Sequence, residues 1–433
     1  MSDLLILSVI GVATVWSLWR PWIGAVLFAW VSLMSPHVAF GWRAGEMPVA
    51  TGIAACTLFG LLLTKERQNP MCGSPAWAIL LFTLWICITL PFSLYFGESL
   101  PLWERSMKIF LMIFVTLILV DDKRKLHWLI WTLAFSIGFF TVKGGVFTLM
   151  TGGNYRVWGP GGFIGGNNEM ALAGVMTIPL LRYIHLQMTH KWARRAMAGA
   201  LGLSVITVLG SYSRGAFLAL SCMALMIWWK GRHKAVVGVM IILLGVAGLA
   251  FMPEQWFERM NTIETYDKDE SALGRLNAWG MAFNLALDRI VGGGFMIYHP
   301  DVYARYAEDP NRVLAAHSIY FQVLGEHGFI GLFLFLGVGL TTWATARRMV
   351  SSARGDPSRQ WLADLGAMVQ VSLVGYAVGG AFLSLAYFDL PYYLAVVVAV
   401  ASHIDQKARR AALKAQRAAR GDAGMGLGWN HGR

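Results

Sequence analysis

The sequence is poor in charge. Only 14% of its 433 residues are Asp, Glu, Lys or Arg, whereas 56% are hydrophobic, and the mean hydropathy is +0.54. These values lie outside the range of ordinary soluble domains. Apolar stretches of the length that crosses a bilayer, about 17 to 25 residues, recur from residue 4 to residue 404. We therefore expect an all-α, polytopic integral membrane protein rather than a soluble multidomain protein.

Cysteine is also scarce, and its spacing argues against two kinds of site. The four cysteines form no Cys-x-x-Cys pair, and all but Cys72 lie inside apolar segments. This pattern indicates neither a disulfide framework nor a thiolate metal centre. The N-terminal segment lacks a basic start and a small-x-small cleavage signal, so we expect it to be retained.

The charge that is present is mainly basic, with a formal net charge of +12. The Lys and Arg residues occupy short connections and the C-terminal tail rather than one continuous face, which argues against nucleic-acid binding. They recur in alternate connections, as is typical of cytoplasmic loops. We therefore place these connections and a basic tail, residues 405–433, in the cytoplasm. The groups are 65–67, 123–125, 191–195, 230–234, 347–359 and 407–420.

Twelve or thirteen spans are predicted, all within a single transmembrane domain of residues 1–404. The first two and the last two candidates are short, so either pair can form a hairpin or a broken helix. Thirteen crossings would place the N-terminus outside, and twelve would place it inside. The candidates lie near 4–19, 22–40, 48–64, 76–94, 107–120, 127–150, 168–186, 197–211, 214–229, 234–252, 316–345, 364–386 and 390–404.

One outward connection, residues 253–315, is far longer than a typical loop. Apolar side chains at helical spacing in 274–289 predict an amphipathic helix on the membrane surface or over a cavity, and GGGF at 292–295 should end it. DKDES at 267–271 has the Asp-x-Asp spacing of some metal sites, but acidic residues before a helix also suit its dipole. We expect no metal and no cofactor.

Several polar residues gather at the outer face in this topology. Arg214 begins a span directly after a tight turn, Arg275 begins the amphipathic helix, and His317 opens the next span. Each has an ordinary alternative, because Arg214 can extend to lipid phosphates, Arg275 can be a surface charge, and His317 can cap its helix. Together they predict a site for an anion.

A second outward loop adds to this predicted site. It contains Arg156 and the sequence GPGGFIGGNNEMAL at 159–172, whose glycines allow backbone N–H groups to approach a ligand closely. Within it, Arg156, Asn168 and Glu169 are possible substrate-binding residues, although Asn168 can also serve only as a helix cap.

His317 is followed by a second histidine and a carboxylate in the same apolar stretch. If 317–340 is one helix, Glu326 lies about 180° around the axis and roughly 13 Å deeper. The two residues then form no direct dyad. We assign Glu326 and His327 to contacts with neighbouring spans, helped by glycines at 325, 328 and 331 that let another backbone approach. A helix N-terminus disfavours imidazolium, so His317 should stay neutral and accept a proton near pH 7.

Three motifs, in this order, resemble the O-antigen ligase and polymerase superfamily, which includes bacterial O-oligosaccharyltransferases. They are SYSRGAF at 211–217, GRLNAW at 274–279 and HSIYFQVLGEHGFIG at 317–331, with the long outward loop between the first and the last. The match is closest to the O-antigen ligases. GGNNEMAL at 165–172 also resembles the first domain of putative O-glycosylation ligases.

The resemblance implies a GT-C-type glycosyltransferase of the bacterial inner membrane. Such an enzyme takes a glycan from undecaprenyl diphosphate on the periplasmic face and joins it to a sugar of lipid A-core, with inversion and without a metal. The family's two essential arginines correspond to Arg214 and Arg275, and its histidine corresponds to His317. A protein O-oligosaccharyltransferase or a polysaccharide polymerase uses the same donor, and a lipid-linked glycan flippase is the alternative from another class.

Overall fold

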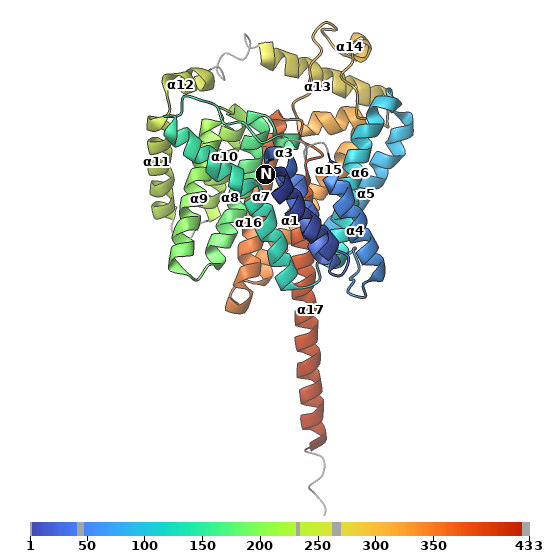
Figure 1. Cartoon of the computed structure of the whole chain (residues 1–433), viewed down its shortest axis with the longest axis vertical. Coiled ribbons are helices and arrows are strands. Elements are labelled where there is room, and N and C mark those ends of the chain that lie inside the picture. The colour runs from blue at the N-terminus through green and yellow to red at the C-terminus, as the bar shows by residue number, and fades with distance from the viewer. Residues whose placement is uncertain (1, 41–46, 231–233, 262–269, 427–433) are drawn as a thin grey trace, which may run out of the picture.

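The structure, a computed structural model, describes residues 2–40, 47–230, 234–261 and 270–426. Every predicted span has a helical counterpart in these ranges. Figure 1 shows these helices as one bundle. They are α1 (Ser2–Trp16), α2 (Pro21–Met34), α4 (Val49–Leu63), α5 (Ser74–Thr89), α6 (Phe96–Leu119), α7 (Lys123–Met150), α8 (Asn167–Gln187), α9 (Lys191–Gly210), α10 (Arg214–Lys230), α11 (Lys234–Phe251), α15 (Ile319–Ser352), α16 (Gln360–Gly379) and α17 (Asp389–Gly426).

The predicted fold class is confirmed, because the described residues form helices without strands and several of the helices suit a membrane. Five helical stretches are both long and apolar enough to cross one. They are Ser74–Phe92, Lys123–Met150, Lys191–Gly210, Ile319–Ser352 and Pro357–Phe382.

Helix α6 begins before its apolar run, with a segment that contains charged residues. The prediction began the fifth span near residue 107, but α6 begins at Phe96. Its first turns contain Glu98, Glu104 and Arg105, all exposed, which interrupt the hydrophobic run without interrupting backbone hydrogen bonding. Hydropathy therefore identified the apolar part of α6 and missed its polar beginning.

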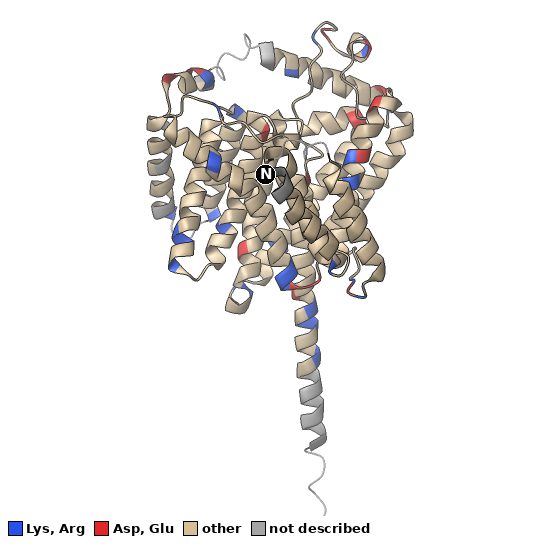
Figure 2. Ribbon diagram, in the orientation of Figure 1, with Lys and Arg blue, Asp and Glu red and all other residues tan. Residues whose placement is uncertain are grey.

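The bundle has two distinct ends. Lys125, at the start of α7, lies 3.1 Å from Glu66 in the α4–α5 connection, and Arg20 in the α1–α2 connection lies 3.7 Å from the same carboxylate. These connections therefore meet at one end, from which α17 also extends (Figure 1). We call it the tail end, and the opposite end, which carries residues 252–261 and 270–318, the loop end. Figure 2 shows Lys and Arg residues gathered in the tail-end connections and along the extension of α17.

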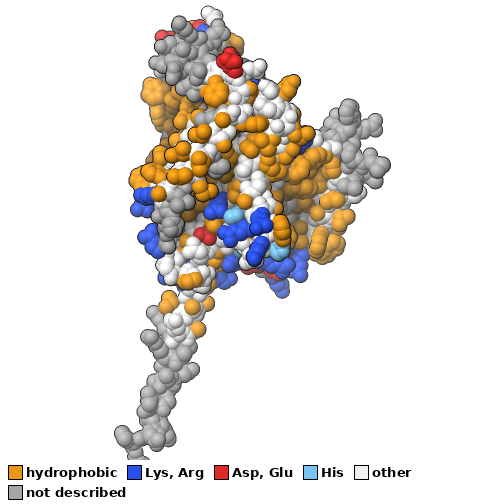
Figure 3. Space-filling model, turned by 90° about the vertical axis from the view of Figure 1, so that its left-hand side faces the viewer, with side chains coloured by type: hydrophobic (Ala, Val, Ile, Leu, Met, Phe, Trp, Pro, Cys, Tyr) orange, Lys and Arg blue, Asp and Glu red, His pale blue; other side chains and the backbone are white. Residues whose placement is uncertain are grey.

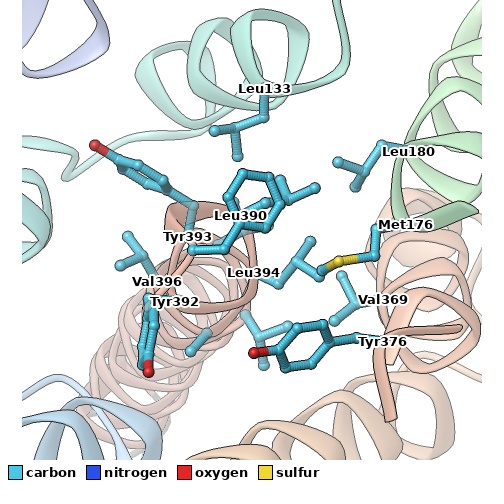
Figure 4. Packing of buried hydrophobic residues seen from close by; sticks show 14 of the residues in the cluster. Leu133, Met176, Leu180, Val369, Tyr376, Leu390, Tyr392, Tyr393, Leu394 and Val396 are labelled. Carbon is cyan, nitrogen blue, oxygen red and sulfur yellow. The ribbon is translucent and has the colours of Figure 1, made fainter. Parts of the chain in front are cut away.

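The apolar part of the last helix lies at the centre of the bundle. Residues 390–401 of α17 are all buried, and Figure 4 shows side chains of this helix surrounded by Leu133 of α7, Met176 and Leu180 of α8, and Tyr376 of α16. Beyond residue 405 the same helix continues into solvent, with exposed side chains from 406 to 416.

Three helices lie in the long connection at the loop end: α12 (Glu254–Asn261), α13 (Glu270–Asp288) and α14 (Pro300–Tyr306). α13 is the helix predicted for 274–289. It buries Ala278, Met281 and Leu285 and exposes Leu276 and Leu287, so it has one face packed on the bundle and another facing outward.

Glycines join this connection to α15. Gly293 and Gly294 donate their N–H groups to the carbonyls of Gly325 and Glu326, both at 2.9 Å. α15 is broken at Gly328, whose φ of 69° is left-handed, and a Cβ there would lie 2.1 Å from the Ile290 carbonyl oxygen. The predicted close approach of another backbone is therefore present, but the uninterrupted helix assumed for 317–340 was wrong.

The outer surface of the bundle is strongly apolar. In Figure 3, hydrophobic side chains cover the upper and middle parts of one side, and Lys, Arg and His side chains gather below them, near the tail end. This distribution fits a molecule whose middle contacts lipid and whose tail end contacts charged headgroups.

Candidate functional site

A short turn between α9 and α10 carries Arg214. Ser213 precedes it and accepts a hydrogen bond from the Ala216 N–H at 3.3 Å through its hydroxyl, which is the geometry of a helix N-cap. Tyr212 has a left-handed φ of 60°, and its hydroxyl donates to the Gly153 carbonyl at 2.7 Å. The turn is thus fixed at both ends, and Arg214 begins α10 with its side chain half-buried.

The glycine-rich loop lies against this turn. The Val157 N–H donates to the Gly210 carbonyl at 3.0 Å, and the Asn167 amide donates to the Ser211 carbonyl at 2.8 Å. The residue that caps α8 is Gly166, with no side-chain cap, so the cap role considered for Asn168 was wrong. The Asn168 side chain instead reaches the pocket beside Arg214.

α13 brings in Arg275, which is half-buried on its first turns. The helix is fixed beside α15 by Trp279, whose indole N–H donates to the Ala316 carbonyl at 2.7 Å and whose ring stacks on Phe321 at 4.8 Å. The same bond holds the chain just before His317. Arg275 and His317 are thus positioned by one tryptophan.

His317 does not belong to α15, which begins at Ile319 after the cap residue Ser318. Its φ of 43° is left-handed, a conformation that costs a non-glycine residue about 1 to 2 kcal/mol. Neighbouring contacts must compensate for that strain, and such strain often occurs at functional sites.

A small polar pocket joins residues from four helices, from the turn before α10 and from the segment after α16. Arg214 of α10, Arg275 of α13 and Asn168 of α8 all line it, together with Arg259 of α12. Its remaining walls are the turn residues Tyr212 and Ser213, Gly215 of α10, and Phe382 and Leu383 after α16. Three guanidinium-bearing residues around one pocket form a region of high positive charge, which favours an anion with several oxygens.

Arg259 was missed by sequence reasoning. α12 is fixed by Trp256, which is only 2% exposed and donates its indole N–H to the Leu209 carbonyl at 3.0 Å. Its ring also packs edge-on against Phe217 at 5.5 Å. Because α12 is attached to the turn that carries Arg214, Arg259 faces the same pocket. The amphipathic sequence EQWFERM, residues 254–260, was the available signal.

Arg156 lies outside this pocket. Its guanidinium carbon is 5.6 Å from the centre of the Tyr212 ring, and its side chain is exposed. Tyr212 forms part of the pocket wall, so Arg156 lies close to the pocket without lining it and adds positive charge at longer range.

The environment of His317 favours its neutral form. Burial is the main factor that lowers its pKa below 6.5, the charge of Arg275 lowers it further, and Glu169 opposes both. The predicted neutrality therefore has a different main cause from the helix N-terminus considered above. The Glu169 side chain folds back toward Gly166, where an added Cβ would lie 2.0 Å from its carboxylate oxygen.

Glu326 and His327 are buried away from His317. The Tyr387 hydroxyl donates to Glu326, and the Thr89 hydroxyl lies 2.8 Å from His327 Nδ1. The His327 carbonyl accepts the Trp85 indole N–H at 2.9 Å. These bonds connect α15 with α5 and with the segment between α16 and α17, as expected for contacts between neighbouring spans.

An apolar groove of about 220 Å³ begins beside the site. It is lined by Ile319 and Tyr320, which follow His317 closely in the chain, and by residues within 335–343 of α15, 373–377 of α16 and 391–392 of α17. The Tyr320 hydroxyl donates to the Ala377 carbonyl at 2.8 Å and connects the two walls. Such a groove suits a hydrocarbon chain.

The possible metal motif cannot be placed, since 267–269 lie outside the described residues, as does Arg43 of another outward loop. Within the described ranges, there is no group of three or more His, Cys, Asp or Glu side chains arranged to hold a metal.

Two family models match the chain. One, described as O-antigen ligase, matches residues 199–336, a segment that contains Arg214, Arg259, Arg275 and His317. The other is a family of unknown function and matches residues 1–189. The chain matches no curated protein.

Proposed function

Because the chain belongs to the O-antigen ligase family through residues 199–336, a family of lipid-linked glycan transfer, we propose that it is an O-antigen ligase of the bacterial inner membrane. It moves the glycan from undecaprenyl diphosphate to a sugar hydroxyl of lipid A-core. In this proposal the loop end is periplasmic, the C-terminus is cytoplasmic, and the helices form a GT-C-type bundle. The observation that carries the proposal is the pocket lined by Arg214, Arg259 and Arg275, together with His317, whose pKa is lowered by burial and by the charge of the same Arg275.

His317 is the proposed general base. The acceptor hydroxyl is a weak nucleophile, and a neutral imidazole can take its proton as the oxygen attacks the anomeric carbon. The new glycosidic C–O bond forms as the bond from that carbon to the diphosphate oxygen breaks. Attack from the side opposite the leaving group inverts the anomeric configuration.

The arginines are proposed to bind the leaving group. Negative charge develops on the lipid diphosphate as the bond breaks, and guanidinium groups stabilise it through charge-assisted, bidentate hydrogen bonds. Arg214 and Arg275 fill this role in the family resemblance, and we add Arg259 because it lines the same pocket. Asn168 contributes an amide group to the same pocket. The charges of Glu169 and Arg156 influence the electrostatic potential in the pocket. No metal is required in this scheme.

The apolar groove supports a lipid-linked donor. Its upper end at Ile319 lies two residues from His317, so a polyprenyl chain in the groove would leave its diphosphate near the arginines. Burying each methylene contributes about 0.8 kcal/mol, and such binding would keep the reacting carbon close to the base.

A protein O-oligosaccharyltransferase and a polysaccharide polymerase share this chemistry, and they differ in the acceptor. A flippase is less well supported. A transporter concentrates its polar site near the bilayer midplane between repeats, whereas the arginines described here lie at the loop end.

The test is a transfer assay with purified protein, lipid-linked glycan, and lipid A-core or a peptide as acceptor. We expect transfer to lipid A-core. The rate of transfer should fall at least 100-fold in the His317→Ala and Arg214→Ala variants. Arg259→Ala should lower it less, mainly by raising KM for the donor. Arg305→Ala, on the exposed side of α14, is the matched control. EDTA should leave the rate unchanged.

Full transfer by His317→Ala would remove the proposed base, and transfer only to the peptide would replace the proposed acceptor. A rate that EDTA abolishes and magnesium restores would revive residues 267–271 as a metal site. Circular dichroism and gel filtration of each variant separate loss of chemistry from loss of folding.

A further inference from the structure

A second candidate lipid site lies at the tail end, on the exposed face of α7. A hollow of about 600 Å³ is lined there by Lys123, Arg124, His127, Trp128 and Trp131. This volume is within the range of about 300 to 1,000 Å³ that is common for small-molecule sites. The reaction proposed above uses none of these residues.

The hollow has net positive charge. In the adjoining cavity, the carboxylates of Glu66 and Asp121 lie 3.1 Å and 2.7 Å from the Lys125 ammonium, and Asp122 caps α7 by accepting the Lys125 N–H. These acids are therefore engaged by other groups. Among the described residues, Arg124 forms no ion pair, and its side chain is exposed.

The second cation is held in place beside the hollow. The Lys123 ammonium lies 4.5 Å from the centre of the Trp361 ring of α16. His127 packs edge-on against the same ring at 5.9 Å, and its Nε2 is 2.9 Å from the Tyr183 hydroxyl. These contacts fix one wall of the hollow, so the Lys123 ammonium is held in a defined position there.

An aromatic stripe continues from the hollow along α7. Trp128, Trp131, Phe135 and Phe139 are 55%, 41%, 41% and 44% exposed, and their spacing of three or four residues places them on one face of the helix. The stripe is about 16 Å long at 1.5 Å per residue, which is close to half of the roughly 30 Å hydrocarbon core. That length matches an acyl chain in one leaflet.

We propose that this surface binds an anionic phospholipid such as phosphatidylglycerol. Its phosphate lies between Lys123 and Arg124, its glycerol region lies beside Trp128, and one acyl chain follows the aromatic stripe. Charge complementarity at one end and a lipid-length apolar face at the other select this occupant over a soluble anion. The proposal stands independently of the reaction at the loop end.

The test measures lipid binding to the full-length protein purified in a neutral detergent. Native mass spectrometry and thermal unfolding are followed as phosphatidylglycerol, phosphatidylcholine or glycerol 3-phosphate is added. We expect retained phosphatidylglycerol and a rise in unfolding temperature with that lipid alone. The Lys123→Ala, Arg124→Ala double variant should lose affinity by about 30-fold, from a contribution of about 1 kcal/mol for each cation.

The Arg409→Ala, Arg410→Ala double variant is the matched control, because it removes equal charge from the exposed part of α17. It should bind like wild type. Equal stabilisation by phosphatidylcholine, a response to glycerol 3-phosphate, or unchanged binding by the Lys123 and Arg124 variant would each overturn the proposal. A Trp131→Ala variant, which keeps both cations, should also bind more weakly and provides a second test if the double variant does not fold.

Discussion

At the scale of single residues, the candidate site depends on the neutral form of one histidine. His317 is partly buried beside Arg275, and both features lower its pKa, whereas Glu169 raises it. A neutral base is present above that pKa and is lost as the pH falls through it. The two charged neighbours act in opposite directions, so each can be tested separately.

The pH dependence of kcat/KM gives that test. The acid limb should lie below pH 6.5 in the wild type, since the pKa of His317 is lowered from that value. Arg275→Ala should move the limb to higher pH, because it removes a positive charge. Glu169→Gln should move it to lower pH, because it removes a negative one. The pH at which the limb falls is compared, rather than the maximal kcat/KM. The maximal value would also change in the Arg275 variant, because Arg275 binds the donor in the proposal.

Arg305→Ala is the control for this measurement, since Arg305 is an exposed cation on α14. A limb that stays in place in both the Arg275 and the Glu169 variants would show that another group sets the acid dependence.

At the scale of elements, the break in α15 positions the loop end. Gly328 allows the Gly292–Gly294 segment to pack against the helix, and the N–H groups of Gly293 and Gly294 bond to carbonyls of its upper part. This upper part begins directly after His317 and Ser318. The break is therefore one of the features that fix the position and direction of the chain at His317, the candidate base.

Gly328→Ala should lower the unfolding temperature and the activity of the purified protein. A left-handed φ costs alanine about 1 to 2 kcal/mol, and its Cβ would lie 2.1 Å from the Ile290 carbonyl oxygen. Gly337→Ala is the control in the same helix, because a Cβ there meets nothing within 4 Å, and it should be neutral or slightly stabilising. Equal unfolding temperatures for the two variants would contradict the role assigned to the break.

At the scale of the whole molecule, α17 organises the bundle. Its first half is enclosed by α7, α8 and α16 (Figure 4), and its N-terminal residue, Asp389, accepts the Ser32 hydroxyl of α2. Its second half extends from the tail end. One helix thus contributes core packing in one part and a solvated basic surface in the other.

Leu394→Ala should destabilise the protein by about 2 to 5 kcal/mol, the usual effect of a cavity in a packed core. Leu394 is fully buried, whereas Leu413 on the same helix is 54% exposed. Leu413→Ala should therefore change stability by less than about 0.5 kcal/mol. Chemical unfolding in mixed micelles compares them, and similar losses for both would argue against α17 as the core helix.

The sequence by itself determined the membrane class, the approximate positions of the helices and the set of polar residues worth testing. These features follow from hydropathy and residue spacing, which are local properties of the chain. The same local view missed the polar start of α6, because charges there interrupt the apolar run without ending the helix. It also assumed an unbroken helix from 317 to 340, because a left-handed glycine does not alter the apolar pattern.

The tertiary structure decided which residues meet. Arg214, Arg259 and Arg275 are on three helices and line one pocket, and Arg156 lies against Tyr212 of its wall without lining the pocket. Packing of Trp256 on Leu209 brought in Arg259, and packing of Trp279 on Ala316 placed Arg275 near His317. Such convergence depends on contacts between elements distant in the chain, and local sequence patterns carry little information about those contacts.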